Sequence, residues 1–265
     1  MADNVAKDTP ERYWPAGGKK VPASLTEAAA AFIAEHSRLL DFVVFYQEGK
    51  LKQLEPYVDV IVGKKDGGDK EAVVREYGRA LDDLTSFSAL MDELVVAKTA
   101  DNFLTYISQL LSLVYKTKPV MLKSGEQERL DFILQYTSMD ELRSAIADKR
   151  VERLAYLGLR DLDDYIAAQM AFRLFESAGD RDRAALIVEY RNLLSHNRGV
   201  VSAVSARRFP QLATSVGKRI EMTHEELRDM RQFLEHAVMD IDVRAAVKFG
   251  LPARVFPTPP SHLME

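Results

Sequence analysis

The residues from Arg191 to Gly199 combine side chains that could cleave RNA without a metal ion. They read Arg-Asn-Leu-Leu-Ser-His-Asn-Arg-Gly, which places an arginine and a histidine five positions apart. Arginine neutralises phosphate oxygens, and the imidazole of histidine titrates near neutral pH. Cleavage by the neighbouring 2′-hydroxyl group needs a base, a cation that stabilises the phosphorane, and an acid for the leaving oxygen. Arg191 and His196 could fill two of these three roles.

The helix that is expected to carry these residues spaces them unevenly. At about 100° per residue, Asn192 and His196 lie one turn apart on one flank, whereas Arg191 lies about 140° from His196. The long arginine side chain could lean around the helix end, or the helix could unwind at His196 because Gly199 favours a left-handed turn. A twofold dimer about this helix would supply a second histidine and bring both motifs into one cleft. The spacing therefore predicts a homodimer.

A basic segment follows the motif. Between Arg191 and Ile220 there is no Asp or Glu, although the whole chain has 40 acids. The same span contains six cations: Arg191, Arg198, Arg207, Arg208, Lys218 and Arg219. Such a local patch suits phosphate contacts, so we expect Asn197, Arg198, Arg207 and Arg208 to contact RNA. The alternative is a solvated face with no ligand.

The pattern R-N-x-x-x-H, followed by Asn and Gly, resembles the signature of the HEPN superfamily of all-α RNA-cleaving and nucleotide-binding domains. The resemblance covers roughly residues 100–248. It implies a helical bundle that dimerises across the motif helix, with Arg191 and His196 as the catalytic pair and Asn192 as the polar residue after the arginine. Residues 1–98 have no counterpart in this resemblance.

The activity that this resemblance implies is that of a metal-independent endoribonuclease. Attack by the 2′-hydroxyl would leave a 2′,3′-cyclic phosphate, in a toxin–antitoxin, antiviral or RNA-processing system, with an antitoxin or regulatory protein as a further partner. The superfamily also contains inactive members. A non-catalytic module that binds RNA, a nucleotide or a protein therefore stays open. So does a purely structural interpretation, in which Gly199 caps the helix and Arg191 pairs with an acid.

The composition sets limits on the other functions. The chain has 265 residues, of which 47% are hydrophobic and 29% charged, and its net charge of -4 does not indicate a general nucleic-acid binder. It has no cysteine, so disulfides and thiolate metal sites are excluded. No two histidines have metal-ligand spacing and no cofactor motif is present, so neither a metal nor a cofactor is expected. The absence of a signal-peptide pattern and of a membrane-length apolar run favours a cytoplasmic location.

Periodicity and capping signals predict an all-α chain that forms an antiparallel bundle. The boundaries expected from these signals are 1–23 for a flexible arm, 24–98 for an N-terminal helical extension, 99–250 for the bundle and 251–265 for a loose Pro-rich tail. The capping pattern Ser24–Glu27 should open a helix that Gly49 ends after about Phe45. Residues 51–62, which include Pro56, fit either a helix or a short strand. The further helices are expected at 70–97, 100–117, 125–136, 139–157, 161–177, 181–196 and 224–249, with a loop or small hairpin at 200–220.

Overall fold

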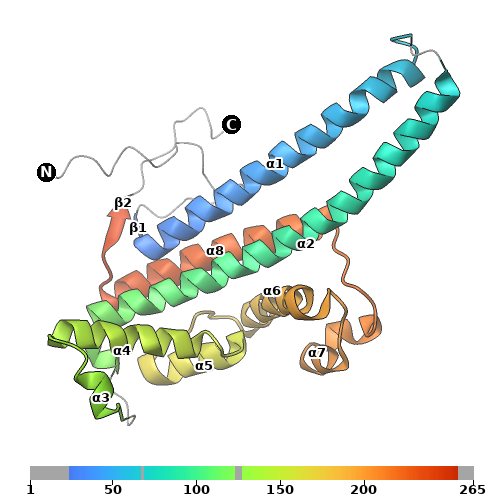
Figure 1. Ribbon diagram of the computed structural model, residues 1–265. Helices are drawn as coiled ribbons and strands as arrows, with labels where there is room; N and C mark the ends of the chain where they lie inside the picture. The colour runs from blue at the N-terminus through green and yellow to red at the C-terminus, as the bar shows by residue number, and fades with distance from the viewer. Residues whose placement is uncertain (1–23, 67–68, 123–126, 256–265) are drawn as a thin grey trace, which may run out of the picture.

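The computed structural model describes residues 24–66, 69–122 and 127–255, and these residues form an all-α fold (Figure 1). The helices are α1 (Glu27–Ile61), α2 (Lys70–Thr117), α3 (Leu130–Ile133), α4 (Met139–Leu154), α5 (Leu159–Met170), α6 (Ala178–Asn197), α7 (Ala203–Arg208) and α8 (His224–Phe249), with 3-10 turns η1 (Pro119–Leu122) and η2 (Pro210–Ser215). The predicted fold class is confirmed. The predictions for the flexible arm at 1–23, for the start of the helix expected at 125–136 and for residues 256–265 of the tail lie outside the described residues.

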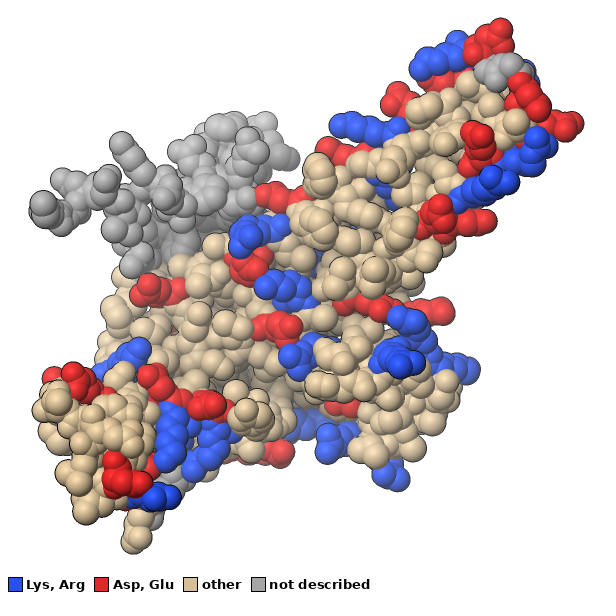
Figure 2. Space-filling view, viewed as in Figure 1, with Lys and Arg blue, Asp and Glu red and all other residues tan. Residues whose placement is uncertain are grey.

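The central element is α2, which contacts α1, α4, α6 and α8. Its second half carries the buried side chains Phe103, Ile107, Leu110 and Val114, which fall on one face as the sequence predicts. Figure 1 shows α1 and α2 running side by side and extending beyond the other helices as a two-helix arm. Figure 2 shows uncharged side chains along this arm between charged ones. Exposed apolar residues of the arm include Phe45 and Leu51.

The prediction that Gly49 ends the first helix was wrong, because α1 continues to Ile61 through both Gly49 and Pro56. A glycine costs a helix only about 1 kcal/mol, which packing against a neighbouring helix offsets. Here that neighbour is α2. Lys50 Nζ donates to Ser88 Oγ over 2.9 Å, and the rings of Tyr57 and Tyr77 meet edge to face at 6.4 Å. The strand alternative for residues 51–62 is thereby excluded.

The prediction of two helices at 70–97 and 100–117 was also wrong, since α2 is continuous. Residues 98–100 are Lys, Thr and Ala. Because none of them is a glycine or proline, nothing in the sequence forces the helix to break there. Thr99 and Ala100 are fully buried. The boundary expected between the N-terminal extension (24–98) and the bundle (99–250) therefore falls inside α2, which forms part of both the two-helix arm and the bundle.

The helix expected at 161–177 is shorter, since α5 ends at Met170 and Ala171 is left-handed with φ 49°. The next residues pass into the core in a non-helical conformation. Their backbone is satisfied by side chains: the buried Asp163 carboxylate accepts the Leu174 N–H over 2.7 Å, and Arg244 donates to the carbonyls of Arg173 and Leu174. Distant partners of this kind leave no local signal, so the prediction carried the helix too far.

Two short strands join the ends of the described chain. β1 (Ser24–Thr26) pairs with β2 (Ala253–Val255) in antiparallel register. Ser24 was predicted to cap α1, and that prediction was wrong. The tail was predicted to be loose from residue 251; this is corrected for residues 253–255, and residues 256–265 lie outside the described part of the chain. Thr26 is the cap, and its N–H and hydroxyl donate to the buried Asp242 carboxylate over 2.8 and 2.6 Å.

Other predicted helix ends agree with the structure. Thr223 and Glu226 form the expected capping box of α8, and Gly250 ends that helix with φ 65°. Ser138 caps α4 and Asp69 caps α2. The helix expected at 125–136 is reduced to the single turn of α3, and Arg129, the N-cap residue before it, makes no side-chain capping bond.

Candidate functional site

The motif lies on the last two turns of α6. Ser177 caps this helix, and Ile187, Val188 and Leu193 bury one side of it. The helix continues through His196 to Asn197, so the predicted alternative of unwinding at His196 is wrong. The left-handed turn expected at Gly199 begins one residue earlier, with φ 53° at Arg198 and 76° at Gly199. The Gly199 N–H then donates to the Leu193 carbonyl over 2.9 Å, which closes the helix end.

The segment after the motif is held against the chain that leads into α8. The Gly199 carbonyl accepts the Ile220 N–H over 2.8 Å, and Val200 pairs with Arg219 in an antiparallel bridge. A Cβ atom on Gly199 would come within 3.2 Å of Arg219 Cγ and 3.3 Å of Leu194 Cδ2. Both the backbone angle and this close approach therefore require glycine. The prediction of a loop or small hairpin for residues 200–220 was wrong in the main, because α7 and η2 occupy most of the segment and its strand pairing is limited to isolated bridges.

Arg191 is fixed by two partners. Its Nε donates to Asp101 Oδ1 of α2 over 2.7 Å, and its Nη1 donates to Asn192 Oδ1 over 3.2 Å. The Arg191 side chain is 30% exposed, so its guanidinium group is restrained but reaches solvent. The pair with Asp101 is the acid partner that the structural interpretation of the motif expects.

The His196 side chain is exposed and makes no hydrogen bond or ion pair with another residue that the structure describes. Because α6 is regular through this residue, His196 stays about 140° from Arg191 around the helix axis. Asn192 lies one turn before His196 and accepts a hydrogen bond from Arg191. The structure thus joins Asp101, Arg191 and Asn192 in one polar chain, and it does not bring the arginine to the histidine within one copy.

The predicted phosphate-binding residues differ in their surroundings. The Asn197 side-chain amide donates to the Val200 carbonyl and so helps to close the turn. Arg198, Arg207, Arg208 and Lys218 are exposed, and none forms an ion pair with another residue in the described part of the chain. Arg207 and Arg208 end α7, and blue side chains lie around this region in Figure 2.

The other two cations of the basic segment are neutralised by α2. Arg191 pairs with Asp101, as described above, and Arg219 Nη2 lies 2.6 Å from Glu93 Oε1. Both acids stand far from the motif in sequence, and sequence reasoning missed them. The signal that could have found them is the helical spacing of two acids, Glu93 and Asp101, which are eight residues apart on one face of α2.

No family model matches the chain, and neither the curated proteins nor the solved structures include one with significant similarity to it. Within residues 24–66, 69–122 and 127–255, no group of three or more His, Asp or Glu side chains is arranged to hold a metal ion. No helix in these ranges has the length and apolar character needed to span a bilayer.

Proposed function

We propose that the protein is a HEPN-like, metal-independent endoribonuclease that works as a homodimer, in a toxin–antitoxin or antiviral system. The observation that carries the proposal is the exposed His196, one helical turn from the amide that holds Arg191. In the basic segment that follows, four exposed cations form no ion pair with another described residue: Arg198, Arg207, Arg208 and Lys218. An RNA backbone could therefore be held beside a titratable imidazole and a positioned guanidinium group.

The proposed reaction is a transesterification within RNA. His196 takes the 2′-hydroxyl proton, and the 2′-oxygen attacks the adjacent phosphorus atom. Arg191 stabilises the extra negative charge of the phosphorane. The 5′-oxygen leaves with a proton from the His196 of a second copy, so the products are a 2′,3′-cyclic phosphate and a 5′-hydroxyl end. In this scheme Asp101 is a positioning residue, because it acts only through Arg191.

The contact between Arg191 and Asp101 favours a second candidate function. An arginine that is already paired with a carboxylate has less positive charge to offer a phosphate. A non-catalytic module would use Arg191 to join α6 to α2, and would use the exposed cations of the basic segment to bind RNA, a nucleotide or an acidic protein. The non-catalytic module would use the same binding surface as the endoribonuclease, but it would not cleave RNA.

The deciding experiment is incubation of the purified full chain with single-stranded RNA in excess chelator. The endoribonuclease should produce fragments with a 2′,3′-cyclic phosphate, and His196→Ala should abolish them. The matched control is His224→Ala, because His224 is also an exposed histidine, 70% exposed, but lies at the start of α8. Cleavage that needs magnesium, or that His196→Ala retains, would overturn the proposal. RNA binding without cleavage in the wild type would establish the second candidate.

A further inference from the structure

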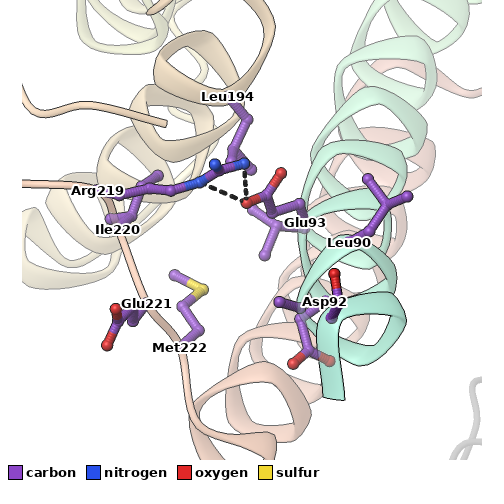
Figure 3. Close-up of a pocket in the computed structure, with 11 residues that line it drawn as sticks. Leu90, Asp92, Glu93, Leu194, Arg219, Ile220, Glu221 and Met222 are labelled. Carbon is purple, nitrogen blue, oxygen red and sulfur yellow. Dashed lines mark hydrogen bonds and ion pairs between the residues drawn. The ribbon is translucent and has the colours of Figure 1, made fainter. Parts of the chain in front are cut away.

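A cavity of about 400 Å³ lies where the arm meets the bundle, and we call it the α2–α6 cavity. One wall is α2, the second is the end of α6, and the third is the segment 219–222 (Figure 3). This volume falls within the range of small-molecule sites. The apolar side chains that line it are Ala89, Leu90, Val96, Leu194, Ile220 and Met222.

The charged groups of this cavity are mostly acidic. Asp92, Glu93 and Glu221 line it together with a single cation, Arg219. From Ala80 to Ala97, α2 has four acids and neither lysine nor arginine. The cavity therefore has an excess of negative charge beside an apolar surface, in contrast to the basic segment that follows the motif.

Two of these carboxylates retain the capacity to bind a cation. Arg219 places both Nε and Nη2 on the same oxygen of Glu93, at 2.8 and 2.6 Å, as Figure 3 shows. Within the described chain, no contact to Glu93 Oε2 accompanies that pair. Asp92 is only 27% exposed and has the imidazole of His224 at 3.7 Å. Burial raises the pKa of the Asp92 carboxyl, although His224 and Lys50 oppose that rise. A bound cation would offset this loss of hydration.

We propose that the α2–α6 cavity binds a small organic cation, with an apolar body against Leu90, Leu194 and Met222 and a protonated amine beside Asp92 and Glu93. The apolar walls exclude a bare metal ion or a polyamine as the best ligand, because these would leave the apolar surface unfilled. The acidic rim disfavours phosphate-bearing ligands. This site is therefore distinct from the proposed RNA surface, and its occupancy does not require RNA cleavage.

Arg219 connects this cavity to the motif. Its guanidinium group binds Glu93 inside the cavity, while its Cγ packs beside Gly199 at the end of α6. A ligand amine that shares Glu93 would compete with Arg219 for that carboxylate. Binding should therefore be sensed at the backbone of Gly199 and Val200, whose bridge to Arg219 closes the motif turn.

The test uses three ligands of equal size and different charge: 4-phenylbutylamine, 4-phenylbutanol and 4-phenylbutanoate. Each is titrated into the full chain and followed by amide NMR shifts. The amine should bind about tenfold more tightly than the alcohol, since a charge-assisted hydrogen bond is worth about 1.5–3 kcal/mol, and the carboxylate should bind weakest. The shifts should centre on residues 89–96 and 219–222 and reach Gly199.

Variants locate the site. Asp92→Asn should reduce amine affinity and leave the alcohol unchanged, whereas Asp140→Asn, an exposed aspartate of α4, should change neither. Ala89→Phe should fill the cavity and remove binding of both, with Ala34→Phe on an exposed face of α1 as its control. Equal binding of the three ligands, or unchanged binding in Ala89→Phe, would overturn the proposal. A third outcome would also overturn the proposal: a helical Leu–Lys peptide binds tightly at residues 89–96 and 219–222 while the amine does not bind. The site would then belong to a protein partner.

Discussion

Arg191 and Asp101 are 90 positions apart in the chain, yet their side chains share a hydrogen bond of 2.7 Å between Nε and Oδ1. This contact fixes the motif helix against the central helix. Its partners are 30% and 45% exposed, so its worth to overall stability should stay below about 1 kcal/mol. Its larger effect should be on the orientation of the guanidinium group.

Removal of the Asp101 charge separates these two effects. Asp101→Asn should leave the thermal midpoint nearly unchanged and lower the rate of RNA cleavage by roughly tenfold, whereas Arg191→Ala should lower it about a hundredfold or more by loss of charge stabilisation. Arg191→Lys should not restore the rate, because lysine cannot bind Asp101 and Asn192 together through one planar group. Initial rates with labelled RNA measure this. An Asp101→Asn rate equal to that of the wild type would show that Asp101 does not position the arginine.

The basic segment should bind RNA without sequence preference. Replacing Arg198, Arg207 and Arg208 together with alanine should weaken binding to several unrelated RNAs by similar factors. The slope of log affinity against log salt concentration should fall by about two, since each phosphate contact to a single strand contributes about 0.7. A triple variant of three exposed arginines elsewhere, Arg38, Arg75 and Arg143, is the control. Affinity that stays the same in the first triple variant would make this segment a solvated face.

Gly199 and Gly78 form a matched pair for stability. Gly199→Ala should destabilise the protein by about 1–3 kcal/mol, because φ is 76° and a Cβ would lie 3.2 Å from Arg219 Cγ. Gly78 lies within α2 with open space around its Cβ position, so Gly78→Ala should stabilise by about 0.5–1 kcal/mol. Urea unfolding of both variants measures the difference. A Gly199→Ala protein as stable as the wild type would contradict the tight closure of the motif turn.

Much of this fold could be predicted from local signals, and the failures have a common cause. Thr223 and Glu226 identify the start of α8 because a capping box satisfies backbone groups within four residues. Gly49 and Pro56 led to a wrong prediction of the end of the first helix. The free energy that they cost the helix locally is offset by the packing of α1 on α2. For the site, the sequence locates Arg191, Asn192 and His196 on one helix. It could not reveal Asp101, because that partner depends on how α2 crosses α6.

A buried pair between α1 and α8 should make stability depend on pH. His36 Nε2 lies 3.8 Å from Glu235 Oε2, and both side chains are buried. Burial lowers the pKa of His36 to about 4 and raises the pKa of Glu235 to about 7, and the nearby Arg231 charge lowers both. The His36 contribution is therefore lost as the pH falls from 6.5 towards 4. The Glu235 contribution is present below pH 4.5 and is lost as the pH rises through 7.

Glu235→Gln isolates the alkaline side of this behaviour. The variant should gain stability relative to the wild type as the pH rises from 5 to 8, by up to roughly 3 kcal/mol, because 1.36 kcal/mol corresponds to each unit of pKa change. Thermal unfolding across this pH range gives the difference. A constant offset between the two proteins at every pH would show that Glu235 does not titrate with folding.

The proposed dimer makes a quantitative prediction for mixed chains. Because Arg191 and His196 point about 140° apart on α6, a cleft shared by two copies should need both histidines. Wild-type and His196→Ala chains mixed in equal amounts should show less than half of the wild-type activity. Sedimentation at micromolar concentration should show a dimer. A fully active monomer would exclude the shared cleft.

The continuity of α2 gives the molecule a lever. A helix of 48 residues is about 72 Å long, and Asp101 lies about 46 Å from its outer end at Lys70. Rotation of this rod by one degree about Asp101 moves its tip by about 0.8 Å. Conversely, a force that deflects the outer end of the arm should displace the Asp101 carboxylate, which binds Arg191. Bending of the arm and the orientation of the Arg191 guanidinium group should therefore be coupled through α2.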